Sequence, residues 1–121
     1  EPTTASRVKY SKPVVVLANR GSFSATNNFV SIMKSLPQVR VVGDVTGGGC
    51  GMPFTSEMPN GWSVRYSASA IADSEGHLTE FGVEPDFKVD MNEEDMLKGK
   101  DTILEKAFEV LDEMVENNKT K

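Results

Sequence analysis

Residues 13–44 contain the pattern that most restricts the fold of this chain. An apolar run, PVVVLAN at 13–19, predicts a strand buried on both faces, as in parallel sheets. Four apolar residues then recur at the spacing of one helical face: Phe29, Ile32, Met33 and Leu36. Pro37 ends that helix, and QVRVVGD at 38–44 predicts a second strand. Strand, helix and strand in this order predict a right-handed βαβ unit with parallel strands.

The pattern changes after the glycine-rich stretch TGGGCG at 46–51. Two strand-like runs at 54–58 and 62–70 flank Pro59-Asn60-Gly61, and Asn-Gly in this setting is a strong β-hairpin signal. In the second run, four apolar residues alternate with polar ones: Trp62, Val64, Tyr66 and Ala68. This alternation predicts a hairpin with one buried face.

The last third of the chain begins with an extended segment. Pro85 disfavours helix before it and predicts a loop over 82–90. Asp90 and Glu93 fit a capping box for a short helix over 91–98.

A final helix closes the chain, with Gly99 ending the short helix and Asp101 capping the long one. Its apolar residues give it a broad face: Ile103, Leu104, Ala107, Phe108, Leu111, Met114 and Val115. The chain has 121 residues, which suits one domain with a core of its own. The expected fold is therefore α/β, with a βαβ unit, a β-hairpin and a C-terminal helix.

Composition excludes several classes of function. The net charge is −5 and the basic residues are scattered, which argues against a nucleic-acid surface. No apolar run approaches the length of a membrane span. Cys50 and His77, the single residues of their kinds, cannot form a disulfide or the usual zinc site, so we expect neither metal nor cofactor. The polar start at 1–12 is expected to be an interdomain or added lead-in to 13–121, in a chain cut from a longer protein.

Two serines, Ser22 and Ser24, lie where the first strand meets the first helix. A serine at a helix N-terminus sits among free backbone N–H groups and the positive end of the helix dipole. That place suits a nucleophile beside an oxyanion hole. It suits ordinary N-capping equally well, so geometry alone leaves both interpretations open.

Three other candidates have simpler explanations. The glycines of 46–51 allow close approach of a ligand, but the stretch lacks the Lys-Ser/Thr ending of a phosphate loop. Cys50 is a possible nucleophile or a partly buried, inert thiol. His77 lies in a polar, turn-like context that is typical of an exposed side chain.

Four stretches in order carry a resemblance over residues 13–90: PVVVLANRGSFSAT, VVGDVTGGGCG, MPNGWSVRYSAS and GVEPD. Together they resemble the tail-specific, C-terminal-processing and tricorn-type serine peptidases. The resemblance implies a crotonase-like, Clp-protease-like spiral of βαβ units. It also implies that Ser24 is the nucleophile and that the Ala25 N–H is an oxyanion donor. The neighbours expected near substrate are Ser22, Phe23, Gly48, Gly49 and Cys50.

The chain departs from one branch of this family. The lysine that serves as base in the processing branch falls at Gly49, and no Lys or Arg occurs between Arg40 and Arg65. The resemblance therefore points to the tricorn-like branch, in which a histidine upstream of the serine is oriented by a downstream glutamate. His77 follows the serine and cannot be that histidine. Glu80 is the expected glutamate, with Glu84 as the alternative.

The resemblance thus implies a part of a serine peptidase that lacks its histidine base and is expected to be inactive alone. Expected partners are a peptide or protein substrate and the upstream domains of the parent chain, in the bacterial envelope or secreted by resemblance. The alternative is a non-catalytic ligand- or protein-binding module of the same fold. An acyl-CoA enzyme of the crotonase type is a third possibility that no residue selects.

Overall fold

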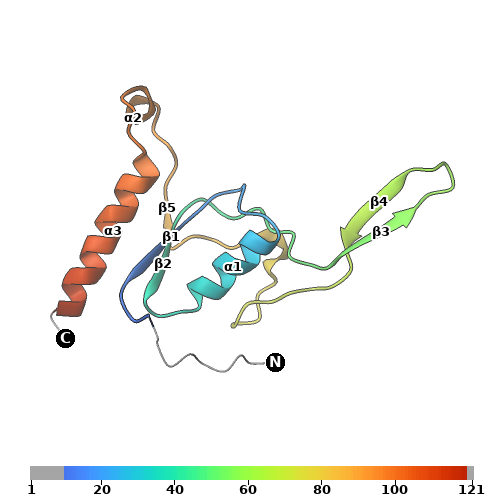
Figure 1. Cartoon of the computed structure of the whole chain (residues 1–121), viewed down its shortest axis with the longest axis horizontal. Helices are drawn as coiled ribbons and strands as arrows, with labels where there is room; N and C mark the ends of the chain where they lie inside the picture. The colour runs from blue at the N-terminus through green and yellow to red at the C-terminus, as the bar shows by residue number, and fades with distance from the viewer. Residues whose placement is uncertain (1–9, 120–121) are drawn as a thin grey trace.

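The computed structural model describes residues 10–119 (Figure 1). Its elements in chain order are β1 (Val14–Ala18), α1 (Ala25–Lys34), β2 (Val39–Gly43), β3 (Pro53–Glu57), β4 (Ser63–Ser67), the 3₁₀ helix η1 (Thr79–Phe81), β5 (Phe87–Lys88), α2 (Glu93–Leu97) and α3 (Thr102–Lys119). None of the helices in this described range is long and apolar enough to cross a membrane.

A three-stranded sheet with the order β1-β2-β5 forms the body of the protein. β1 and β2 are parallel, in a register that runs from Val14 opposite Val39 to Ala18 opposite Gly43. This confirms the predicted βαβ unit. The segment predicted to be only a loop contains β5, which pairs in parallel with the end of β2. Two residues of strand are too short for a periodic pattern to reveal.

The two faces of the sheet pack against different helices. Ala18 and Val41 form one apolar cluster with Val30 of α1. Val42, the next residue along β2, points the other way and packs with Ala107 and Val110 of α3. Figure 1 shows α1 and α3 on opposite sides of the sheet. β2 is therefore covered on both faces. The strand for which this was predicted, β1, shows it only in part, because Ala18 is buried whereas Leu17 is 46% exposed.

The prediction of the buried face of α1 was wrong. Asn27, Val30 and Ser31 are the buried residues of this helix. Phe29 and Ile32, which were expected to face the core, are 53% and 58% exposed. The apolar spacing identified a helix correctly, but the polar partners of Asn27 decide which side turns inward.

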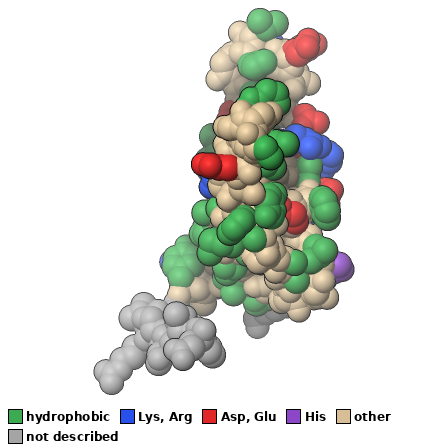
Figure 2. Space-filling view, turned by 90° about the vertical axis from the view of Figure 1, so that its right-hand side faces the viewer, with side chains coloured by type: hydrophobic (Ala, Val, Ile, Leu, Met, Phe, Trp, Pro, Cys, Tyr) green, Lys and Arg blue, Asp and Glu red, His purple; other side chains and the backbone are tan. Residues whose placement is uncertain are grey.

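β3 and β4 form the predicted antiparallel hairpin, which projects away from the sheet (Figure 1). Gly61 has a φ of 84° at the end of the connecting turn, where the Gly61 N–H donates to the Met58 carbonyl. The predicted buried face was wrong, since every residue of both strands is exposed. Hydrophobic side chains lie in the open on this side of the molecule (Figure 2). Those of the hairpin are Phe54, Met58, Trp62, Val64 and Tyr66.

The two C-terminal helices follow the prediction except at one cap. Asn92, rather than Asp90, caps α2 by accepting from the Glu94 N–H at 2.8 Å. Asp101 caps α3 as predicted, accepting from the Leu104 N–H at 2.9 Å. The predicted face of α3 is only partly buried: Ala107 is inside, whereas Leu104 and Phe108 are 40% and 55% exposed.

Candidate functional site

Ser24 is the residue directly before α1, and it lies six positions after the end of β1. Its backbone has φ 57° and ψ −117°, and it is the only non-glycine residue with positive φ in the described range. Its side chain makes no capping hydrogen bond. The N-capping interpretation is therefore wrong, and the hydroxyl is left free at a strained turn. Such conformations cost roughly 1–3 kcal/mol and concentrate at functional sites.

The glycine-rich loop after β2 holds this turn in place. The Ser24 N–H donates to the Gly48 carbonyl at 2.8 Å, and Gly47 N–H donates to the Ser22 carbonyl at 3.0 Å. The ring of Phe23 lies against Gly49, where an added Cβ would come within 2.3 Å of the ring. Within this loop the requirement for glycine is strictest at Gly48, where an added Cβ would come 2.1 Å from the backbone carbonyl oxygen of Glu80. The glycine loop therefore packs directly against the turn that carries Ser24.

One backbone group and one side chain lie directly beside Ser24. The Ala25 N–H, the first of α1, has no hydrogen-bond acceptor within residues 10–119 and is free to bind an anion. Cys50 Sγ lies 3.7 Å from the Ser24 carbonyl oxygen.

Glu80, in η1, lies in the same pocket as Ser24, a space of about 510 Å³. One carboxylate oxygen accepts from the Ser67 hydroxyl at 2.6 Å and the other from the Gly51 N–H at 3.0 Å. The Ser67 hydrogen bond, and then the Gly51 one, hold the pKa of Glu80 below its ordinary value. Its carboxylate is therefore ionised at neutral pH. Glu84 lines a different pocket.

A buried polar cluster that sequence reasoning missed joins α1 to Thr79, the residue before Glu80. The side chain of Asn27 is fully buried and donates to the Thr79 carbonyl at 3.0 Å and to Cys50 Sγ. It also accepts from the Thr46 hydroxyl. An asparagine within a helix gives no signal of this, because its burial depends on partners distant in sequence.

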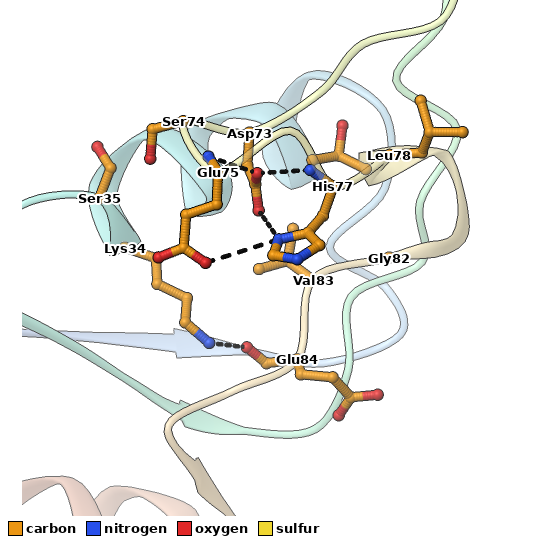
Figure 3. A pocket seen from close by; sticks show the side chains of 11 residues that line it. Lys34, Ser35, Asp73, Ser74, Glu75, His77, Leu78, Gly82, Val83 and Glu84 are labelled. Atoms are coloured by element: carbon orange, nitrogen blue, oxygen red, sulfur yellow. Dashed lines mark hydrogen bonds and ion pairs between the residues drawn. The ribbon is translucent and has the colours of Figure 1, made fainter.

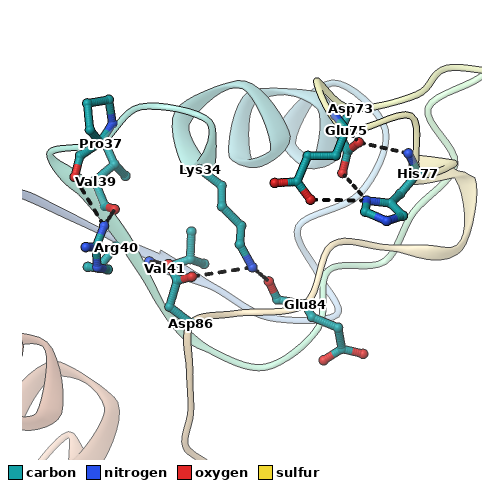
Figure 4. Close-up of polar contacts among 10 residues, drawn as sticks. All are labelled: Lys34, Pro37, Val39, Arg40, Val41, Asp73, Glu75, His77, Glu84 and Asp86. Atoms are coloured by element: carbon teal, nitrogen blue, oxygen red, sulfur yellow. Dashed lines mark hydrogen bonds and ion pairs between the residues drawn. The ribbon is translucent and has the colours of Figure 1, made fainter.

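His77 lines another pocket, together with Asp73 and Glu75 (Figure 3). Its Nδ1 is 3.2 Å from the Asp73 carboxylate, and its side chain is 72% exposed. The pocket lined by His77 and the pocket lined by Ser24 have no residue in common. Lys34 also lines the pocket of His77, and its ammonium group forms an ion pair with Asp86 (Figure 4). The prediction of an exposed turn histidine is confirmed.

Solved structures resemble this chain over most of its length. A candidate peptidase from Parabacteroides merdae is 54% identical with a TM-score of 0.83, over 88% of this chain and 34% of that one. Mature CPAF in complex with lactacystin is 28% identical with a TM-score of 0.65, over 90% of this chain and 20% of that one. The photosystem II D1 C-terminal processing protease is 26% identical with a TM-score of 0.51, over 64% and 20%.

The chain thus spans about a third of the first of these proteins and about a fifth of the other two. A family model described as peptidase family S41 matches residues 1–89, which is more than half of the chain. The chain belongs to peptidase family S41.

Proposed function

We propose that residues 13–121 are the nucleophile-bearing part of the catalytic domain of a serine endopeptidase. The observation that carries the proposal is the strained turn at Ser24, with its hydroxyl free of any cap. Membership of family S41 supports it. So does the similarity to CPAF, which has also been crystallised as a serine-to-alanine variant.

In the proposed reaction, Ser24 Oγ attacks the carbonyl carbon of a peptide bond and its proton passes to a base. The Ala25 N–H stabilises the oxyanion that forms. When the C–N bond breaks, the base returns the proton to the departing amine, and water then hydrolyses the ester on Ser24. Five neighbours would lie near the bound peptide: Ser22, Phe23, Gly48, Gly49 and Cys50.

The base must come from outside the described part of this chain. Gly49 replaces the lysine of the processing branch, and His77 lines another pocket. We infer that an upstream histidine of the parent supplies the base, as in the tricorn-like branch. Glu80 would orient this histidine, because its ionised carboxylate shares the pocket of Ser24. Glu84, in the other pocket, is the weaker alternative. The 121-residue chain alone would then be inactive.

The same proposal extends to the rest of the parent protein, its substrates and its location. Upstream domains of the parent would complete a crotonase-like, Clp-protease-like spiral around the sheet, with residues 1–12 as the lead-in between them. Residues 1–9 of that lead-in lie outside the described range. Substrates would be peptides or proteins, and the location would be the bacterial envelope or the exterior, on resemblance alone. The upstream gene sequence tests this through the presence of an export signal.

The test of the function is peptide hydrolysis by the full-length parent. Ser24→Ala should abolish turnover, whereas Ser35→Ala, at the opposite end of α1, should leave it unchanged. A parent that binds peptides tightly but never cleaves them, with or without Ser24, would favour the alternative of a binding module.

A further inference from the structure

We propose that Asn27 is the positioning residue of this site, setting the distance and orientation between the turn that carries Ser24 and the segment that carries Glu80. The inference rests on the proposed peptidase function, since it assigns Asn27 a task in the same site. Asn27 lies three residues after Ser24, on the same side of the first turn of α1. Its side chain is 0% exposed.

The Asn27 side chain binds one flank of the segment 80–82 directly and the other flank through Thr46. Before this segment, the Thr79 carbonyl accepts from Asn27 Nδ2 at 3.0 Å. After it, the Val83 N–H donates to the Thr46 hydroxyl at 2.7 Å, and that hydroxyl donates onward to Asn27 Oδ1. One side chain therefore ties the glutamate-bearing segment, at both its ends, to the helix of the serine.

The second hydrogen of the same amide reaches the glycine loop. Asn27 Nδ2 also donates to Cys50 Sγ, and Cys50 directly follows the glycine that packs on Phe23. The amide thus uses both of its N–H groups and its oxygen, all in a buried place. A fully paired buried network holds its members rigidly, whereas one missing partner leaves costly unpaired groups. Aspartate has the shape of asparagine but, when ionised, cannot donate either hydrogen bond.

This arrangement predicts an effect on the chemical step rather than on substrate binding. Asn27 is fully buried and does not line the pocket of Ser24, so it acts through other residues. A shift of about 1 Å between catalytic groups costs on the order of 10²-fold in rate. Loss of the amide should therefore lower kcat about 10- to 100-fold and leave KM nearly unchanged.

The test uses the full-length parent with Asn27→Ala and Asn27→Asp. Two matched controls come from the same helix and its C-terminal cap. Ser35→Ala removes a hydroxyl that donates to the Ile32 carbonyl and lines neither pocket of Ser24. Val30→Ala destabilises the helix through its apolar cluster without touching the polar network. For each variant, kcat, KM, the rate of fluorophosphonate labelling of Ser24 and the melting temperature are measured.

The expected result is that both Asn27 variants lose kcat and labelling rate, while both controls keep them. Wild-type kcat in a folded Asn27→Asp would overturn the inference. So would an equal loss of kcat in Val30→Ala at a matched melting temperature. If neither Asn27 variant folds, Thr46→Val is measured in their place, because it removes the hydrogen bond between the Thr46 hydroxyl and Asn27. A folded Thr46→Val with unchanged kcat would overturn the inference. Activity that survives Ser24→Ala would instead overturn the proposed function.

Discussion

The Ser67 hydroxyl donates a 2.6 Å hydrogen bond to Glu80, joining the base of the β3-β4 hairpin to η1. It is the largest cause that holds the pKa of Glu80 below its ordinary value of 4.5. A carboxylate with a lowered folded-state pKa contributes stability that is complete above the unfolded pKa. That contribution is lost as the pH falls through the folded value. The contribution of Glu80 is therefore present at neutral pH and disappears in acid below 4.5.

Ser67→Ala should raise the pKa of Glu80 toward its ordinary value, because the strongest donor to the carboxylate is gone. Titration of the Glu80 carboxyl carbon by NMR measures this directly. Ser56→Ala, on the other strand of the hairpin, is the matched control and should leave the pKa where it is. An unchanged pKa in Ser67→Ala would show that the hydroxyl does not hold the carboxylate.

Gly48→Ala should be much more destabilising than Gly76→Ala. Both glycines have positive φ, 73° and 88°, so the backbone strain of the substitution is shared. An added Cβ at Gly48 would come 2.1 Å from the Glu80 carbonyl oxygen, whereas at Gly76 nothing lies within 4 Å. The extra cost at Gly48 should be about 1–3 kcal/mol. Thermal unfolding followed by circular dichroism checks this, and equal melting temperatures would contradict the close packing of the two loops.

Labelling of Cys50 with a bulky maleimide should reduce peptide turnover by the full-length parent. The reason is its position beside the Ser24 carbonyl, in a separate small pocket that Ser24 also lines. Cys50→Ser treated with the same reagent is the control, because it keeps a hydrogen-bond acceptor for Asn27 but cannot be labelled. Full turnover after complete, mass-verified labelling would argue against a substrate-proximal thiol.

Much of the fold followed from local pattern, and its errors have a common cause. The β1-α1-β2 unit was predictable because apolar runs and helical spacing are properties of neighbouring residues. Which face of α1 turns inward was not, since Asn27 is buried by Thr46 and Thr79, its partners 19 and 52 positions away. The exposed hairpin is a similar case. Alternation of apolar and polar residues predicts which face of the hairpin is apolar. It does not predict which other segment, if any, packs against that face.

The candidate site was predictable in position rather than in conformation. The junction of strand and helix located Ser24, but its φ of 57° and its uncapped side chain are visible only in the structure. The expectation of Glu80 came from resemblance, and its hydrogen bonds to Ser67 and Gly51 come from loops that no local pattern aligns.

The most direct test of the central claim compares fluorophosphonate labelling of Ser24 in the isolated 121-residue chain and in the full-length parent. A serine hydroxyl needs a base to become a nucleophile, and a triad without its base keeps only about 10³–10⁴-fold catalysis over water. We predict rapid labelling of the parent, abolished by Ser24→Ala, and labelling of the isolated chain barely above background. Rapid labelling of Ser24 in the isolated chain would contradict this account, because the base would then lie within these residues.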